Sequence, residues 1–187
     1  MVKVTTVSGY KPFELGIFKK DEQAVTYIKR AIKKQLLSLL DEGLEWVLIS
    51  GQLGTELWAA EVVYELQEEG FEHLQLGVIT PFLNVEGNWK EDNKEWYESI
   101  VASADYVDAV SRKPYENPNQ FKMKNIFHLS KSDCLILFFD TEKEGSPKYL
   151  FEEALNYQNK KNYSIHQISF YDIQLIVEED QMTQDGF

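Results

Sequence analysis

The sequence predicts an α/β fold, a Rossmann-like three-layer sandwich built on a mainly parallel sheet. Three short apolar runs, at residues 47–49, 74–80 and 134–140, are typical of strands that are covered on both faces. Between them, apolar residues recur every three or four positions, as in the helices of βαβ units. A chain of 187 residues suits one domain, and we expect residues 1–187 to form it.

The chain is expected to open with a strand, an elaborate loop and a helix. Residues 3–8 are rich in β-branched side chains and form the predicted first, central strand. Residues 9–18 make a loop with two glycines, a proline and three aromatic rings. Such connections usually take about 2–6 residues, so its length favours a functional role. A helix is expected over residues 21–42, and Gly43 ends its apolar pattern.

Residues 46–67 contain the next predicted strand, a glycine-bearing turn and a helix. The turn, residues 50–54, precedes Thr55 and Glu56, which suit a helix N-terminus. Free backbone N–H groups and the positive end of the helix dipole would converge there, which is the physical basis of phosphate binding. Gly54 is expected to allow a close backbone approach in this turn.

The rest of the chain is predicted to contain further helices and strands with weaker patterns. Helices are expected over residues 91–102, 117–130 and 148–160, and short strands over residues 106–110 and 164–170. The acidic tail after about residue 178 is expected to be loose.

The charge of the chain limits its partners. A formal net charge of −12 opposes binding to nucleic acid or to an anionic membrane, because both depend on Lys and Arg that neutralise phosphates. Nucleic acid is therefore not expected as a partner. An alternative stays open, because a basic cluster beside aromatic residues could bind a nucleic acid strand. The cluster comprises Arg112, Lys113, Lys122, Lys124 and Lys131.

The cysteine content and the opening of the chain predict a cytoplasmic protein. The single cysteine, Cys134, lies within the most apolar run and is expected to be buried in a reducing compartment. The chain opens without a signal-peptide pattern and has no apolar run long enough for a bilayer, so we expect no membrane insertion. His73, His128 and His166 are scattered singly, so we expect no metal site.

Four loops are expected to meet at the carboxyl edge of the sheet, where open parallel sheets bind ligands. Tyr10 could stack on a base in this site, and Lys11 could contact a phosphate. The candidate ligand-binding residues on the four loops are Gly9, Tyr10, Lys11, Ser50, Gly51, Gln52, Gly54, Thr55, Glu56, Thr80, Pro81, Phe82, Asp140, Gly145 and Ser146.

Three segments carry a resemblance to a known family: GYKPFELGIF (residues 9–18), LISGQLGTELWAAE (48–61) and KNIFHLSKSDCLILFFDTEKEGSPKY (124–149). The whole chain resembles the YpsA-like family of Gram-positive bacteria, a branch of the Rossmann-like SLOG superfamily. That superfamily also holds the DNA-processing protein DprA and the cytokinin-activating LOG phosphoribohydrolases. The resemblance implies a single SLOG domain that binds a nucleotide-related ligand such as ADP-ribose, NAD or a nucleoside phosphate. Members are associated with cell division, so a cell-division protein is implied as a partner.

Several positions match the motifs of these relatives. Ser50, Gly51, Gly54 and Glu56 resemble the glycine loop of LOG and DprA proteins, and Glu56 falls where DprA places an aspartate. Asn125 matches a helix position that is common in the superfamily, so the resemblance adds it to the candidate ligand-binding residues.

Two departures put the activities of the relatives in doubt. LOG enzymes carry Pro-Gly-Gly-x-Gly-Thr-x-x-Glu after the strand equivalent to residues 134–140. Here only Gly145 and Ser146 echo that motif, and Tyr149 stands in the place of its glutamate. The arginine of the DprA glycine loop is also missing from this chain.

Three functions remain open at this stage. The first is a binding protein that senses a nucleotide-like ligand and reports it to a partner. The second is a hydrolase of an N-glycosidic bond with Glu56 as its acid or base, although Glu56 could instead serve as favourable charge at a helix start. The third is a DprA-like binder of single-stranded DNA. Whether the chain is an enzyme stays open, and an apolar face with Trp96 and Tyr97 could support a homodimer.

Overall fold

The computed structural model describes residues 1–186 and contains a six-stranded sheet in which neighbouring strands run parallel. The strands are β1 (Val4–Gly9), β2 (Trp46–Ile49), β3 (Gln75–Thr80), β4 (Tyr106–Ala109), β5 (Cys134–Phe138) and β6 (Ser164–Ile168). Their order across the sheet is β4-β3-β2-β1-β5-β6, so β1 is central, as predicted. The predicted α/β, Rossmann-like fold class is confirmed.

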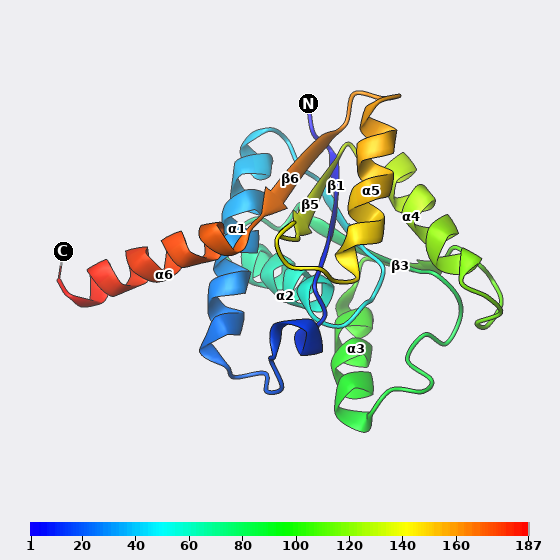
Figure 1. Ribbon diagram of the computed structural model, residues 1–187, viewed down its shortest axis with the longest axis horizontal. Coiled ribbons are helices and arrows are strands. Elements are labelled where there is room, and N and C mark those ends of the chain that lie inside the picture. The colour runs from blue at the N-terminus through cyan, green and yellow to red at the C-terminus, as the bar shows by residue number, and fades with distance from the viewer. Residues whose placement is uncertain (187) are drawn as a thin grey trace.

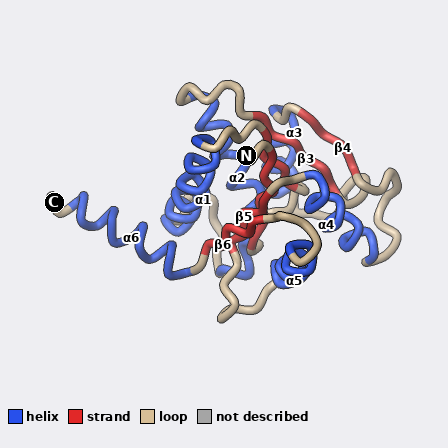
Figure 2. The backbone as a smooth tube through the Cα atoms, turned by 90° about the horizontal axis from the view of Figure 1, so that it is seen from above, coloured by secondary structure: helices blue, strands red, loops and turns tan. Residues whose placement is uncertain are grey.

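Helices cover both faces of the sheet and so complete three layers. Figure 2 shows α1 (Gln23–Asp41) and α2 (Thr55–Glu68) on one face, and α4 (Asn119–Lys131) and α5 (Pro147–Gln158) on the other. α3 (Glu91–Ser103) packs against α2, and α6 (Phe170–Gln184) packs against α1. A short 3-10 helix, η1 (Pro12–Leu15), lies in the loop after β1. Within residues 1–186, no helix combines the length and the apolar character needed to cross a membrane.

The sheet is buried on both faces because its central strands are apolar throughout, as in other parallel sheets. Every residue of β5 is buried, and β2 is buried from Val47 to Ile49. Cys134 begins β5 and is fully buried, as predicted. Burial raises the pKa of its thiol to about 11, so the group stays protonated and packs as a small apolar side chain.

The strand order reverses at β1, and this reversal creates a place for a ligand. From β1 the chain builds β2, β3 and β4 toward one edge, and then returns to place β5 on the other side of β1. The loops that follow β1 and β5 therefore lead to helices on opposite faces of the sheet (Figure 1). Such a switch point leaves a crevice outside the carboxyl ends of the strands.

The end of the chain differs from the prediction, because the tail after residue 178 is helical instead of loose. α6 continues to Gln184, and β6 ends at Ile168, two residues before the predicted limit. Ser169 and Asp172 form a capping box at the start of α6. Asp180 then pairs with Arg30 of α1 at 2.7 Å. The cap and this contact give the acidic segment partners that its composition alone did not reveal, although α6 extends away from the body of the molecule (Figure 1).

Gly54 is the point where the loop after β1 crosses the turn before α2. Its backbone has φ 92° and ψ −126°, a conformation that side chains disfavour. A Cβ at this position would lie 2.6 Å from the carbonyl oxygen of Tyr10 and 2.8 Å from Cδ of Pro12. Thr55 also donates to the Tyr10 carbonyl, from its backbone N at 3.2 Å and its Oγ1 at 2.9 Å. The close approach expected at Gly54 is thus made by the protein's own first loop.

Replacing Gly54 by alanine should lower the free energy of unfolding by about 2–4 kcal/mol, because the new Cβ adds overpacking to backbone strain. Gly16→Ala is the matched control, since Gly16 also has positive φ (69°) but has no atom within 4 Å of a Cβ. The control should lose only about 1–2 kcal/mol. Urea unfolding of both variants measures the difference, and equal losses would show that the contact with the first loop contributes nothing.

Candidate functional site

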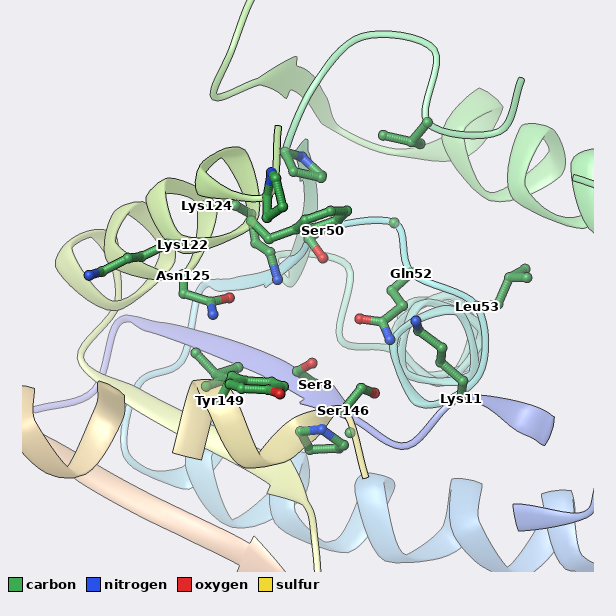
Figure 3. A pocket seen from close by; sticks show the side chains of 18 of the residues that line it. Ser8, Lys11, Ser50, Gln52, Leu53, Lys122, Lys124, Asn125, Ser146 and Tyr149 are labelled. Carbon is green, nitrogen blue, oxygen red and sulfur yellow. The ribbon is translucent and has the colours of Figure 1, made fainter. Parts of the chain in front are cut away.

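A cavity of about 750 Å³ opens at the carboxyl edge of the sheet, within the size range of small-molecule sites. Its floor comes from the ends of β1 and β2, and its walls come from α4, α5 and the loop after β3. Figure 3 shows these elements around the central space. The predicted site residues that line it are Gly9, Lys11, Ser50, Gly51, Gln52, Pro81, Phe82, Asn125 and Ser146.

The other predicted residues lie behind the cavity wall and hold the loops together. They are Tyr10, Gly54, Thr55, Glu56, Thr80, Asp140 and Gly145. Thr80 donates through Oγ1 to the Phe82 carbonyl at 3.0 Å. Asp140 accepts from the backbone N of Phe170 at 3.1 Å. These residues shape the carboxyl edge without facing the cavity.

Tyr10 packs in the core instead of being available to stack on a base. Its side chain is fully buried, with ring centroids of Phe138 and Phe170 at 5.2 Å and 5.8 Å. Its hydroxyl is hydrogen-bonded to the Lys143 carbonyl at 2.7 Å and accepts from the backbone N of Asp140 at 2.9 Å. Burial raises the pKa of this hydroxyl above its usual value. The ring therefore anchors the loop after β5, a role that the aromatic content of the first loop did not distinguish from ligand stacking.

Glu56 fills the anion-binding turn that the sequence predicted for a phosphate. Its carboxylate is 2% exposed and accepts from the backbone N of Ser50 at 2.6 Å and of Gln52 at 3.3 Å. The hydroxyls of Ser50 and Ser8 also donate to it, each at 2.8 Å. Both carboxylate oxygens are thus engaged, and Glu56 does not line the cavity. The geometry gives it the role of a favourable charge at the start of α2.

A second carboxylate, from Glu14, occupies the start of α5 in the same way. It accepts from the backbone N and the hydroxyl of Ser146, both at 2.7 Å, and from the backbone N of Lys11 at 2.8 Å. Burial alone would raise the pKa of this carboxyl, but the hydrogen bonds outweigh it and hold the pKa below its usual value. At the starts of both α2 and α5, a carboxylate of the protein itself therefore accepts the hydrogen bonds that an anionic ligand could have received.

Lys11 and Lys124 supply positive charge to the cavity. Figure 3 shows them pointing inward from opposite sides, Lys11 from the loop after β1 and Lys124 from α4. Neither lies within 4 Å of an acidic oxygen in the part of the chain that the structure describes. Burial lowers the pKa of the Lys124 ammonium, although Glu56 and Glu153 favour its charged form. An anionic group placed between the two lysines would meet two cations without internal partners.

The sequence interpretation missed most of the residues that α4 and α5 contribute. Lys122 and Lys124 appeared only as members of a basic cluster, because the sequence does not fix which face of α4 meets the sheet. Tyr149 and Glu153 continue the helix face that begins at Ser146. Tyr149 lies three residues after Ser146, and Glu153 lies four residues after Tyr149, and this helical spacing was the signal that could have found them.

Aromatic and apolar side chains form the outer part of the cavity. Phe13, Phe121 and Tyr149 line it and remain exposed. Phe82 packs against Phe121 at 5.5 Å between ring centroids and against Tyr115 at 5.2 Å. Within residues 1–186, no three His, Cys, Asp or Glu side chains are grouped to hold a metal ion. The lining thus combines cations with flat apolar surfaces, which suits an organic anion.

Among solved structures, the fold is similar to DNA processing protein A from Helicobacter pylori, which is described as binding single-stranded DNA. The TM-score is 0.52 at 14% sequence identity, and the likeness covers 98% of this chain and 81% of that one. The expectation that nucleic acid is not a partner is contradicted by this neighbour, since a protein of the same fold binds a nucleic acid. Net charge was a poor guide because it averages over the whole surface, whereas binding depends on local groups.

The sequence comparisons identify the family. The chain is 56% identical to the UPF0398 protein YpsA of Bacillus subtilis (strain 168) over 179 residues, which cover 96% of this chain and 99% of that one. It is 54% identical to a UPF0398 protein of Bacillus cereus (strain B4264), over 96% of this chain and 97% of the relative. The model of the YpsA family, described as the "YspA SLOG family", matches residues 5–173. The chain therefore belongs to the YpsA family of SLOG proteins.

Proposed function

We propose that the cavity binds a nucleotide-like ligand, such as ADP-ribose, NAD or a nucleoside phosphate, with its phosphate between Lys11 and Lys124. The observation that carries the proposal is the pair of inward-pointing lysines without ion-pair partners among the described residues. In a chain of net charge −12, two cations left unpaired beside one cavity favour an anionic ligand.

The apolar part of the cavity supports a ligand that also carries a flat ring. Phe13, Phe121 and Tyr149 present exposed ring surfaces there. Stacking of a base on an aromatic side chain contributes about 1–3 kcal/mol. A phosphate held by lysines and a base held by an aromatic ring are the two ends of one nucleotide.

Binding without turnover is the form of this function that the site favours. The hydrolase hypothesis rested on Glu56, whose two oxygens already accept four hydrogen bonds from Ser8, Ser50 and Gln52. An acid or base must reach the reacting atom, and Glu56 lies behind the cavity wall. We therefore propose a sensor that reports the bound ligand to a partner protein.

Replacing Lys124 by methionine should weaken binding of ADP and ADP-ribose by roughly 10–150-fold, because a hydrogen bond to a charged group contributes about 1.5–3 kcal/mol. Lys131→Met is the matched control, since Lys131 is an exposed lysine of the same helix and does not line the cavity. Isothermal titration calorimetry measures both variants, with chromatography of the mixtures to detect a released base. Unchanged affinity in Lys124→Met would contradict the proposal. Release of a base would show that the ligand is cleaved and would favour the hydrolase hypothesis over the sensor.

The affinity for a nucleoside phosphate should fall at a lower pH than it would if the binding lysine had its usual pKa. The phosphate binds the protonated Lys124, and burial lowers the pKa of this ammonium. Affinity is therefore full below that pKa and is lost as the pH rises through it. The charged groups that face Lys124 are Glu56, Glu153 and Lys11. The second ionisation of a phosphate has a pKa of about 6, so the ligand itself changes little above about pH 7.

Lys124→Arg is the control for this pH dependence, because a guanidinium stays protonated throughout. Titrations up to about pH 10, below the usual pKa of lysine, should show the loss in the original chain and a flat profile in the arginine variant. Identical profiles in both proteins would assign the pH dependence to another group.

Single-stranded DNA is a second candidate ligand, favoured by the aromatic groups at the mouth of the cavity. Phe82, Tyr115 and Phe121 form an exposed or half-exposed cluster, and Lys122 lies next to Phe121. Lysines interleaved with aromatic rings are typical of surfaces that bind single strands. The structural neighbour that binds single-stranded DNA adds a reason to test this ligand.

A short single-stranded oligonucleotide should then bind with a steep dependence on salt. If Lys11, Lys122 and Lys124 each contact a phosphate, the slope of log K against log salt should be about −2. Phe121→Ala should weaken binding by roughly 5–150-fold, because one base loses its stacking partner. Fluorescence anisotropy at several salt concentrations measures both effects. Binding of nucleotides without binding of the oligonucleotide would exclude this second candidate.

A further inference from the structure

Two side chains in the cavity wall carry polar atoms that nothing in the described chain satisfies. Asn125 of α4 is 7% exposed, and its Nδ2 donates to Oε1 of Glu153 on α5 over a long 3.5 Å. Its Oδ1 and the Oε2 of Glu153 are both buried and have no hydrogen-bond partner among the described residues. Leaving such acceptors unpaired is costly, so a site with two of them side by side calls for an explanation.

The pair differs from the other polar groups at the carboxyl edge. The carboxylates of Glu14 and Glu56 accept hydrogen bonds at both of their oxygens. Asn125 and Glu153 instead line the cavity with one unused acceptor each. The terminal torsions of Asn and Glu are broad, so a rotation of either group can turn its free oxygen toward the cavity.

Tyr149 places a flat surface beside this pair. It lies four residues before Glu153 on α5, which puts both side chains on the same face of the helix. Its ring lines the cavity and is 69% exposed. Figure 3 shows Tyr149 and Asn125 on the same side of the cavity. A planar ring stacked on Tyr149 would therefore lie in the part of the cavity that Asn125 and Glu153 also line.

We propose that Asn125 and Glu153 read the base of the ligand and select a planar heterocycle with two adjacent N–H donors along one edge, as guanine has. Each donor would meet one of the two free acceptors. Adenine has an exocyclic amine without an adjacent ring N–H, and hypoxanthine has the ring N–H without an adjacent exocyclic amine, so neither base offers both donors along one edge. The inference rests on the proposed function, which places the phosphate of the ligand, and adds the identity of the base.

The electrostatics of Glu153 are consistent with this assignment. Burial raises the pKa of its carboxyl, and the hydrogen bond from Asn125 and the nearby Lys122 and Lys124 only partly oppose the effect. The N–H group that a ligand donates to the free oxygen of Glu153 would stabilise the carboxylate that burial disfavours. The lysine that faces the phosphate, Lys124, directly precedes Asn125 in α4, so one helix contributes to both ends of the site.

The test compares guanosine, inosine and adenosine monophosphates by calorimetry. The chain should bind the guanine nucleotide roughly tenfold or more tightly than the other two. Glu153→Gln should reduce this preference to within about twofold. Glu152→Gln is the matched control, because Glu152 is the exposed neighbour that does not line the cavity. A guanine preference retained in Glu153→Gln would overturn the inference while leaving the proposed function intact.

Two further measurements separate the remaining outcomes. The first is the calorimetric affinity for 2′-deoxyguanosine monophosphate. If this nucleotide binds more weakly than guanosine monophosphate while inosine monophosphate binds equally well, the pair binds ribose hydroxyls and the base assignment is wrong. If no nucleotide binds, the proposed function fails, and guanosine without phosphate is then titrated while the NMR signals of the Asn125 side-chain amide are followed. Shifts with guanosine and not with adenosine would support the inference alone, and unmoved signals would overturn it as well.

Discussion

The buried carboxylate of Glu56 is the interaction on which the carboxyl edge of this fold depends. It joins the hydroxyl of Ser8, at the end of β1, to the backbone and hydroxyl of Ser50, just after β2. Each of these donors is buried, so loss of the acceptor would leave several polar groups unpaired, each at a cost of about 1–3 kcal/mol. These hydrogen bonds fix where the loops after β1 and β2 begin. Ser8 and Ser50, which donate them, also line the cavity.

This arrangement changes how the site can bind an anion. A glycine turn before a helix offers N–H groups and a positive dipole, but here Glu56 takes them at α2 and Glu14 takes them at α5. The proposed phosphate would therefore meet side-chain cations instead of the starts of α2 and α5. Lysine is a flexible point charge, whereas a helix end is a fixed one. If a phosphate binds as proposed, its position would be adjustable, whereas the buried carboxylates hold the loops in place.

The sequence predicted the fold well because fold depends on patterns that a sequence displays. The continuous apolar run from Cys134 to Phe138 is typical of a strand that is covered on both faces, and every residue of β5 is buried. The helical spacing of apolar residues identifies α1 and α2 without tertiary information. The tail after residue 178 was predicted wrongly because composition shows neither the capping box that begins α6 nor the pairing of Asp180 with Arg30, which is far away in the sequence. Composition reports the acidity of this segment but not its partner.

The site was only half predictable, because the direction of a side chain is decided by packing. The loops at the carboxyl edge were identified from strand ends, and residues such as Lys11, Ser50 and Ser146 do line the cavity. Tyr10, on the loop after β1, and Glu56, in the first turn of α2, instead turn inward, since the aromatic core and the buried hydroxyls offer them better partners. The opposite wall was largely missed, because no pattern in α4 or α5 states which face meets the sheet.

The misleading inference from net charge has a physical explanation. At physiological ionic strength, exposed charges are screened beyond about 8 Å, so most of the acidic surface has little effect inside a cavity. What a ligand meets there is set by the nearest groups, and two of these are Lys11 and Lys124 without acidic partners among residues 1–186. A chain of net charge −12 can thus hold a positively charged site, and the acidity of the remaining surface governs only how polyanions approach from a distance.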